Sequence, residues 1–315
     1  MFTFAGKLHI NNFSCIMANV IKIKKGLDIN LKGKASDVLL NGGKSESYAI
    51  VPDYYNGILP KVVAKVGEKV KAGSVLMIDK NRPEIKFVSP VSGEVTAVNR
   101  GEKRKVLSIV VKPDAQIEYE EFGKKNVASL QGAEVKEVLL NAGMWPFIKQ
   151  RPYDIIAAPL DTPRDIFVSA FYSAPLAPNF DFIVKGQEAD FQTGLNALAK
   201  LTNGKVYVGV RSGSVVSGMK GVEIVEVEGP HPAANVGVQI NHIKPVNKGE
   251  VVWTVNPADV IVIGRLFNKG VADFSRMVAI TGSETTERGY VKTISGCTIK
   301  SLVNGKVLGQ EHIRI

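Results

Sequence analysis

The sequence predicts an α+β multidomain protein built from three successive units. Short apolar runs broken by glycines and prolines over residues 62–111 are typical of half-buried strands in a β sandwich. Strands alternate with helices over residues 129–230, a pattern that favours an α/β domain with a largely parallel sheet. Two strands and a short helix between residues 277 and 303 indicate a small β-grasp module. We expect a tail at residues 1–16, followed by domains at residues 17–127, 128–255 and 256–315.

The first unit contains a short internal sequence repeat. Residues 66–70 (VGEKV) return as residues 100–104 (RGEKR), and each copy follows a valine-rich strand. A repeat this short indicates a quasi-twofold β sandwich. An alternating strand over residues 20–23 comes before it, just after Met17, which is an alternative start of the chain. Residues 26–61 are rich in Gly, Asn and Ser, and we expect them to wrap the sandwich as extended chain.

This pattern is similar to the biotinyl/lipoyl-type barrel-sandwich hybrid, in which a hairpin tip bears a modified lysine. Lys80, which follows Asp79, takes that position here. The methionine-flanked lysine of biotin carriers is absent, and the arm from Lys80 to Ser89 is longer than in lipoyl domains. A solvated turn lysine is therefore the favoured interpretation, and a biotin- or lipoyl-type carrier module is an alternative.

The second unit opens with a helix predicted over residues 128–142, which ends at Gly143 and a following proline. Strands are predicted over residues 154–158 and 166–168. Residues 191–201 have leucines at helical spacing, and the strand 206–210 follows. This alternation is the basis for the α/β domain.

Nucleotide-binding motifs are missing from this unit. Residues 213–218 (GSVVSG) are followed by Met219 and Lys220, which misses the phosphate loop by one residue and lacks its Ser/Thr. A plain turn is favoured there. His231 stands at the tip of a proline-bracketed loop with no second histidine or carboxylate at ligand spacing. A loop histidine held by backbone hydrogen bonds is favoured over a metal ligand.

The third unit is predicted from three short stretches. Residues 259–264 (DVIVIG) form either a strand or the start of a buried helix. Residues 277–281 and 289–294 form two strands around a polar turn. A short helix is predicted over residues 298–303.

Composition narrows the class of protein. At 315 residues with 45% hydrophobic residues, the chain is long enough for two or three domains with proper cores. It has no apolar run of the roughly 18 residues that span a bilayer and no recognisable secretory signal, so we expect a cytoplasmic protein. Cys15 and Cys297 are too few and too far apart for a disulfide framework or an iron–sulfur site.

The net charge of +10 is uneven along the chain. Residues 1–130 carry 21 Lys/Arg against 13 Asp/Glu, a net +8, which leaves +2 for the rest. The lysines are not interleaved with aromatic residues, which disfavours nucleic acid. An anionic membrane surface or a partner protein is the expected contact of this basic module, unless it is only a solvated face.

With these residues in view, the chain resembles the NqrA family, the A subunits of the sodium-translocating NADH:quinone oxidoreductase. It more distantly resembles the C subunits of Rnf electron-transport complexes and the flavin-bearing subunit of respiratory complex I. The matching stretches keep their order along the chain: residues 23–28 (IKKGLD), 66–70 (VGEKV), 99–104 (NRGEKR), 204–208 (GKVYV), 229–233 (GPHPA), 245–247 (PVN) and 259–261 (DVI).

The resemblance implies a barrel-sandwich hybrid, a flavin-domain-like α/β domain and a soluble-ligand-binding β-grasp domain. It implies a peripheral subunit on the cytoplasmic face of the bacterial inner membrane, in a pump that couples NADH oxidation by quinone to sodium export. The other subunits are the implied partners. NADH, flavins, an iron–sulfur centre and quinone serve the complex, with the flavins and the iron–sulfur centre on other subunits. The isolated chain is therefore expected to bind no cofactor and not to oxidise NADH.

The chain departs from its flavin-binding relatives in one motif. They carry a glycine-rich loop ahead of Gly-Phe-Pro, where this chain has residues 141–147 (NAGMWPF). Fewer glycines keep the backbone from a close approach to a flavin phosphate. The family also continues past the residue that matches Ile315, so a C-terminal portion is expected to be absent. A free-standing flavin-binding oxidoreductase is the alternative function.

The resemblance also implies that quinone is handled at or near this chain. A quinone head needs aromatic or apolar walls and one or two hydrogen-bond donors. Two loops supply these residue types, although aromatic loop residues also commonly pack domain interfaces. The predicted quinone-binding residues are Tyr54, Tyr55, Trp145, Phe147, Lys149 and Arg151.

Overall fold

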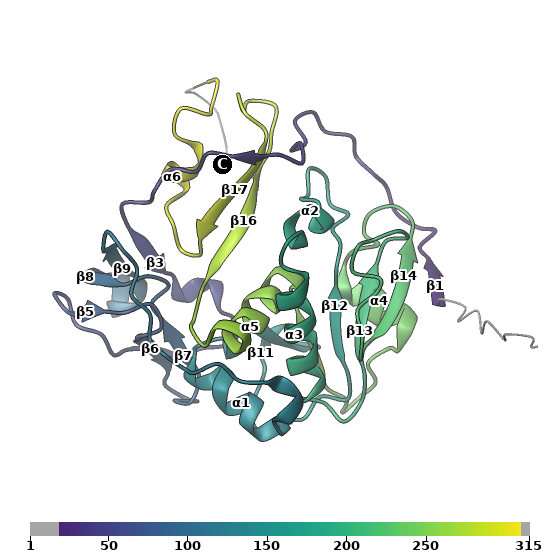
Figure 1. Cartoon of the computed structure of the whole chain (residues 1–315), viewed down its shortest axis with the longest axis horizontal. Helices are drawn as coiled ribbons and strands as arrows, with labels where there is room; N and C mark the ends of the chain where they lie inside the picture. Colours follow the sequence, from purple (N-terminus) through teal and green to yellow (C-terminus); the bar gives the residue numbers. More distant parts are fainter. Residues whose placement is uncertain (1–18, 310–315) are drawn as a thin grey trace, which may run out of the picture.

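The computed structural model describes residues 19–309, and the strands of this part form four sheets (Figure 1). The tail expected at residues 1–16, together with Cys15, lies outside the described residues. No helix between residues 19 and 309 is long and apolar enough to cross a membrane.

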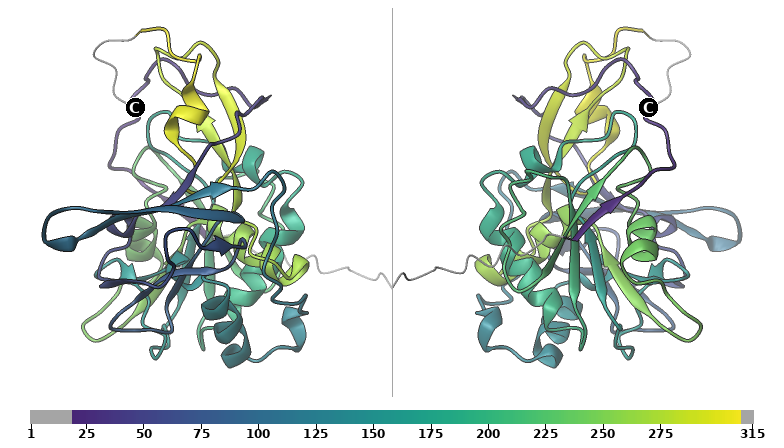
Figure 2. Two further views of the ribbon diagram at one scale, coloured as in Figure 1. Left: turned by 90° about the vertical axis from the view of Figure 1, so that its left-hand side faces the viewer. Right: turned by 90° about the vertical axis from the view of Figure 1, so that its right-hand side faces the viewer.

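Two facing antiparallel sheets form the first unit, and they confirm the predicted β sandwich. Leu76, Val95 and Ile109 are fully buried between them, as the alternation of apolar and polar residues requires. The long β8–β9 hairpin projects from the body of the molecule (Figure 2). One sheet has the order β3 (Tyr48–Ile50), β9 (Val106–Pro113), β8 (Gly93–Arg100), β5 (Lys69–Val70), and the other β4 (Pro60–Val62), β6 (Val75–Asp79), β7 (Lys86–Val88).

A seven-stranded sheet forms the second unit. In the order given below, the first five strands are parallel to one another, and the last two pair in antiparallel fashion. The order is β1 (Asn19–Lys22), β14 (Glu223–Glu228), β13 (Val206–Val210), β12 (Ile166–Ser169), β15 (Val252–Val255), β10 (Ile148–Arg151), β11 (Ile155–Ile156). The four parallel strands β12 to β15, numbered in chain order, therefore lie 3-2-1-4. The order reverses between β12 and β15, so this is the topological switch point.

Helices cover both faces of this sheet (Figure 1). Ile166 and Val168 share a core with α3 (Glu188–Ala199) and α5 (Pro257–Lys269). Phe167, which points the other way on the same strand, packs with Ile240 of α4 (Val236–Ile243). Burial on both faces explains why the parallel strands are short continuous apolar runs. The remaining helices are α1 (Gly132–Asn141) and α2 (Phe180–Val184).

Three expectations about this part of the chain need correction. Strand β1 does not join the sandwich but pairs in parallel with β14, in the seven-stranded sheet. Residues 26–47 run along the second and third units rather than around the sandwich, since Leu27 bonds His231 and Gly33 bonds Gly282. Residues 259–264, for which the sequence allows either a strand or a helix, belong to α5. Because α5 packs on α3, the boundary expected at residue 256 separates elements that share one core.

The third unit is a three-stranded sheet, β16 (Ser275–Ile280), β17 (Gly289–Ile294) and β2 (Leu39–Leu40), with α6 (Ile299–Val303). The two strands and the helix were predicted. The third strand, β2, comes from the N-terminal segment and pairs in parallel with β17. Its contribution was missed because pairing between residues so distant in the chain leaves no local signal.

A buried carboxylate secures the start of β12. Asp165 is 1% exposed; its Oδ2 accepts hydrogen bonds from Arg164 at 2.7 Å and Lys244 at 2.8 Å, and its Oδ1 accepts the Lys205 amide at 3.1 Å. Burial opposes ionisation, but these donors outweigh it and hold the pKa of Asp165 below its usual range. Ionised Asp165 therefore stabilises the fold at neutral pH.

Asp165→Asn is expected to lower the free energy of unfolding at pH 7 by about 2 kcal/mol, the scale of a charged hydrogen bond. Because the pKa of Asp165 is depressed on folding, its contribution is present above the unfolded value and is lost as pH falls through the folded one. Urea unfolding at pH 7, 5 and 3.5 should show the difference between wild type and variant shrinking with acid. A difference that does not change with pH would contradict the assignment.

Candidate functional site

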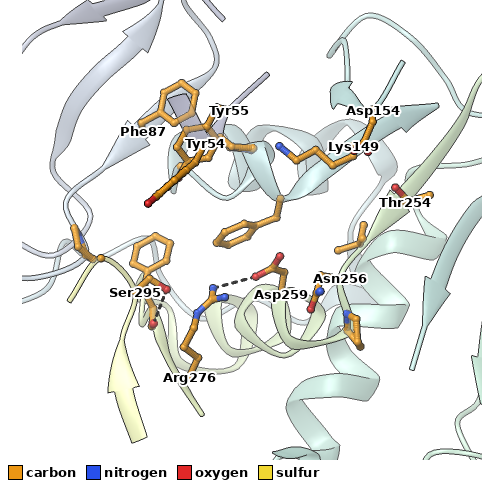
Figure 3. A pocket seen from close by; sticks show the side chains of 18 of the residues that line it. Tyr54, Tyr55, Phe87, Lys149, Asp154, Thr254, Asn256, Asp259, Arg276 and Ser295 are labelled. Carbon is orange, nitrogen blue, oxygen red and sulfur yellow. Dashed lines mark hydrogen bonds and ion pairs between the residues drawn. The ribbon is translucent and has the colours of Figure 1, made fainter. Parts of the chain in front are cut away.

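A cavity of about 680 Å³ lies where the three units meet. Its walls come from β3, the loop after β3 and β7 in the sandwich, from the ends of β12 and β15, and from residues around β16. Figure 3 shows the side chains that line it. Ser169 is the last residue of β12 and Phe171 follows this strand, while Thr254 lies near the end of β15 and Asn256 follows it. The cavity therefore sits at the carboxyl ends of the two strands that flank the topological switch point, where open α/β sheets bind their ligands.

Aromatic rings form one wall of the cavity. Tyr55 packs edge-on against Phe87 of β7 with ring centroids 4.6 Å apart. Phe147 packs edge-on against Phe274 at 6.1 Å. These four rings come from all three units, so a flat ligand between them would contact side chains of each unit.

Lys149 of β10 points into the cavity (Figure 3). Its ammonium lies 5.5 Å from the centroid of the Tyr55 ring, within range of a cation–π interaction. Within residues 19–309 it makes no hydrogen bond or ion pair with another side chain. Burial lowers the pKa of Lys149, against the opposing pull of Asp154 and Asp259. The site thus offers a partly desolvated cationic donor to a ligand.

An ion pair crosses the opposite side of the cavity. Arg276 Nη2 lies 3.0 Å from Asp259 Oδ1, and the side chain of Asp259 is 15% exposed. Burial raises the pKa of Asp259, and the guanidinium of Arg276 opposes that shift. Asp259 stands in the first turn of α5, where the helix dipole favours a negative charge.

Helix α5 begins at the cavity because Asn256 caps it. The Asn256 side chain accepts a hydrogen bond from the Ala258 amide at 3.0 Å and another from the Tyr172 hydroxyl at 3.2 Å. Burial raises the pKa of Tyr172 to about 12, so its hydroxyl keeps its proton at neutral pH. These contacts fix the loop after β12 to the start of α5.

The structure brings five of the six predicted quinone-binding residues to this one cavity: Tyr54, Tyr55, Phe147, Lys149 and Arg151. Trp145 is not among them. It is fully buried, donates its Nε1 hydrogen to the Ala157 carbonyl at 2.8 Å and packs edge-on against Trp253. Its placement in the site was wrong because the ring and its polar atom are both satisfied in the core.

Sequence reasoning missed the other half of the site: Phe87, Tyr172, Asn256, Asp259, Phe274 and Arg276. Asp259 carried a weak signal, since a carboxylate in the first turn after an Asn-Pro start is typical of a helix N-terminus. Nothing local predicted that it would face Arg276.

The other candidates from the sequence have local roles. Asp181 Oδ1 accepts hydrogen bonds from Ser214 Oγ at 2.6 Å and the Val215 amide at 3.2 Å, so a carboxylate occupies the loop in which a phosphate was considered. His231 lies 3.1 Å from Ser173 Oγ, and its amide donates to Asp28. Among residues 19–309 no group of three or more His, Cys, Asp or Glu side chains could hold a metal ion.

Lys80 is exposed at the end of β6, next to buried Asp79. Asp79 pairs with Arg82 at 2.9 Å, and Arg82 in turn donates to the Ile156 carbonyl in the second unit. This turn is therefore fastened to a neighbouring unit, whereas a carrier arm must be free to move.

The fold defines a multidomain α+β chain, in which a β sandwich, an α/β unit and a small third sheet surround one cavity. Family models match each of these units. The NqrA N-terminal barrel-sandwich hybrid domain matches residues 21–114, the NqrA second alpha/beta domain residues 130–272 and the NQRA C-terminal domain residues 277–315. The chain belongs to the NqrA family.

Curated relatives named as the A subunit of Na(+)-translocating NADH-quinone reductase include proteins of Neisseria meningitidis, 35% identical over 297 residues, and Hahella chejuensis, 37% identical over 293 residues. These alignments cover 93% and 91% of this chain, and 66% and 65% of the relatives. The chain thus spans just under two thirds of their length. Among solved structures, an NAD+-reducing [NiFe]-hydrogenase chain aligns with 62% of this chain and 45% of its own, at 9% identity and a TM-score of 0.35, too low to carry an argument.

Proposed function

We propose that this chain is a peripheral cytoplasmic subunit of a respiratory sodium pump, in which NADH oxidation by quinone drives sodium export. The names of the relatives, at 35–37% identity, support this proposal. The partners would be the other subunits of the complex, on the cytoplasmic face of the bacterial inner membrane. The cavity at the junction of the three units would contribute to quinone binding.

We assign the flavins and the iron–sulfur centre of that complex to other subunits. Dinucleotide and flavin phosphates are usually held by a glycine-rich turn after the first parallel strand. Residues 169–185, which follow β12, contain no glycine, so the backbone there lacks the freedom that such a turn needs. The isolated chain is accordingly expected not to oxidise NADH. A purified protein with flavin absorbance would instead favour the free-standing flavoenzyme.

The finer fold assignments belong to the same proposal. The 3-2-1-4 order of the parallel strands supports a flavin-domain-like second unit. The mixed sheet β16-β17-β2 followed by α6 supports a β-grasp third unit.

The observation that carries the quinone assignment is the shape and chemistry of the cavity. Tyr55 and Phe147 supply aromatic walls, and a quinone ring is flat and weakly polar. Lys149 supplies a donor with no partner among the described residues, suited to a quinone carbonyl. A half-buried ammonium beside aromatic walls fits a neutral ring with two acceptors.

Tyr55→Leu is expected to weaken quinone binding about tenfold, because the variant loses both a ring wall and the ring that faces Lys149. Isothermal titration of the isolated chain with a soluble short-chain quinone measures the dissociation constant. Quenching of Trp145 and Trp253, which are both buried outside the cavity wall, gives a second readout after inner-filter correction.

Tyr153→Leu is the matched control, since Tyr153 is 78% exposed and does not line the cavity. Equal loss in both variants would point to a general effect on folding. Unchanged affinity in Tyr55→Leu would place the ligand elsewhere, and no saturation in wild type would mean that this chain alone makes no quinone site. For the carrier alternative, the intact mass would show a cofactor added at Lys80.

A further inference from the structure

An extended surface segment leaves an unusual amount of apolar side chain in solvent. Residues 24–32 run as an extended segment between β1 and β2 (Figure 1). All of them are exposed. Leu27 is 70% exposed, Ile29 54% and Leu31 55%. Scattered single apolar residues are normal on a surface, but three within five residues are typical of an interaction site. We refer to residues 27–31 as the docking segment.

The backbone of the docking segment is held in place at both ends. The Leu27 amide donates to the His231 carbonyl at 2.9 Å, and the His231 amide donates to Asp28 Oδ1 at 2.8 Å. Beyond the segment, the Gly33 carbonyl accepts the Gly282 amide at 2.8 Å. The segment is therefore ordered before any partner arrives, which lowers the entropic cost of binding.

Between these anchors three successive backbone donors are unused. The amides of Asp28, Ile29 and Asn30 make no hydrogen bond within residues 19–309, whereas the Leu31 amide donates to the Ile29 carbonyl. In an extended segment every second amide lies on the same edge. An added β-strand would therefore pair with the Asp28 and Asn30 amides, on the edge away from the Leu27–His231 bond.

A groove runs beside the docking segment. It has a volume of about 380 Å³ and is lined by residues 28–31 on one side and by the loop 170–179 on the other. Arg211 lies in the groove and is fixed by bonds to the Val227 and Gly229 carbonyls. An extended peptide could thus place backbone along the docking segment and side chains in the groove.

The charges around the docking segment favour a partner that carries acidic residues. Lys24, Lys25, Lys32 and Lys34 are all exposed, while the nearest acid, Asp28, is engaged by the His231 amide. A partner strand that carries acidic residues next to apolar ones would complement both features.

We propose that the docking segment receives an extended, acidic and apolar segment of a partner protein, which adds to it as a β-strand. An anionic membrane also matches exposed leucines and lysines. However, burying leucines in lipid would take the unpaired Asp28, Ile29 and Asn30 amides out of water without partners, which is costly. A partner strand would satisfy the Asp28 and Asn30 amides. A second copy of this chain is disfavoured by its net charge of +10.

The test rests on the proposed function, because it uses the other subunits as the source of the partner. Inner membranes that hold the complex without this chain are titrated with purified wild type, with Leu27→Glu/Leu31→Glu, and with Val66→Glu/Leu160→Glu. Val66 and Leu160 are 62% and 93% exposed and lie outside the docking segment and the groove, so they control for added negative charge. We expect the first variant to bind at least tenfold more weakly and the control to bind within twofold of wild type.

Hydrogen exchange of the bound wild-type chain gives the second readout. The amides of Asp28 and Asn30 should exchange at least tenfold more slowly in the complex than in the free chain. Equal binding of both double variants, or no slowing at Asp28 and Asn30, would overturn the inference while wild-type binding upheld the proposed function. Failure of wild type to bind would overturn both.

Two further outcomes would identify a different occupant and so overturn the proposal. Vesicles of phosphatidylcholine with phosphatidylglycerol, without protein, would bind wild type but not Leu27→Glu/Leu31→Glu if the partner were an anionic membrane. Light scattering of the isolated chain would show a dimer that the same substitutions abolish if the partner were a second copy.

Discussion

Replacing Arg265 with leucine is expected to lower the free energy of unfolding by about 3–5 kcal/mol, the range for breaking a buried ion pair. Arg265 lies on α5 and is 4% exposed. Its guanidinium donates to Gln187 Oε1 at 2.6 Å, to the Asp273 carbonyl at 3.0 Å and to the Ser275 carbonyl at 2.9 Å. It therefore joins the start of α3 to the chain that enters β16, and leucine would leave all of these acceptors unpaired.

The charges around Arg265 add to that cost. Asp273 and Asp190 are 13% and 20% exposed in their side chains and lie 3.4 and 3.7 Å from the guanidinium. Burial disfavours the charge on Asp273, but Arg265, together with hydrogen bonds from Ser275 and Lys269, outweighs this and keeps the pKa of Asp273 low. Without Arg265 this carboxylate remains in a poorly solvated place.

Urea unfolding at pH 7 measures the loss. Arg100→Leu is the matched control, since Arg100 is exposed on the β8–β9 hairpin and its replacement should stay within about 0.5 kcal/mol of wild type. Arg276 directly follows Ser275, whose carbonyl Arg265 holds. Quinone affinity in Arg265→Leu should therefore also fall if the proposed site is correct. A loss below about 1 kcal/mol would mean that the network contributes little to stability.

Local patterns predicted many of the elements of this fold. The strand predicted at residues 206–210 coincides with β13, and the leucine spacing at 191–201 falls on α3, which spans Glu188–Ala199. The run at residues 259–264 was ambiguous, because a buried helix and a buried strand are both continuous apolar stretches. The run belongs to α5, and its apolar residues are continuous because this helix is buried on most sides, against α3 and the sheet.

The pairing of strands that lie far apart in the chain could not be predicted from local sequence patterns. The alternation in β1 indicates a strand, but its partner β14 lies some 200 residues further on. The candidate site shows the same division. Loop aromatics beside glycine and proline indicated Tyr55 and Phe147, whereas Asp259 and Arg276 meet only because α5 and β16 pack together. Trp145 was assigned to the site because an aromatic residue type does not by itself distinguish a residue of the cavity wall from a residue of the core.

Gly264→Ala is expected to lower the free energy of unfolding by about 3 kcal/mol, the upper end for overpacking, although alanine favours a helix over glycine by about 1 kcal/mol. The two helices α3 and α5 approach each other at glycines. A Cβ on Gly264 would overlap the Asp190 carbonyl oxygen and lie 2.6 Å from the Gly194 amide nitrogen. These are backbone atoms, so relief requires one helix to move as a whole, and α5 would carry Asp259 away from Arg276.

Gly218→Ala provides the control, because a Cβ there meets nothing within 4 Å and its backbone is not left-handed. It should stay within about 0.5 kcal/mol of wild type. If α5 moves as expected, Gly264→Ala also weakens quinone binding in native buffer, while Gly218→Ala leaves it unchanged. A neutral or stabilising Gly264→Ala would show that the helices separate without cost, and that the close approach of α3 and α5 does not hold Asp259 in the cavity.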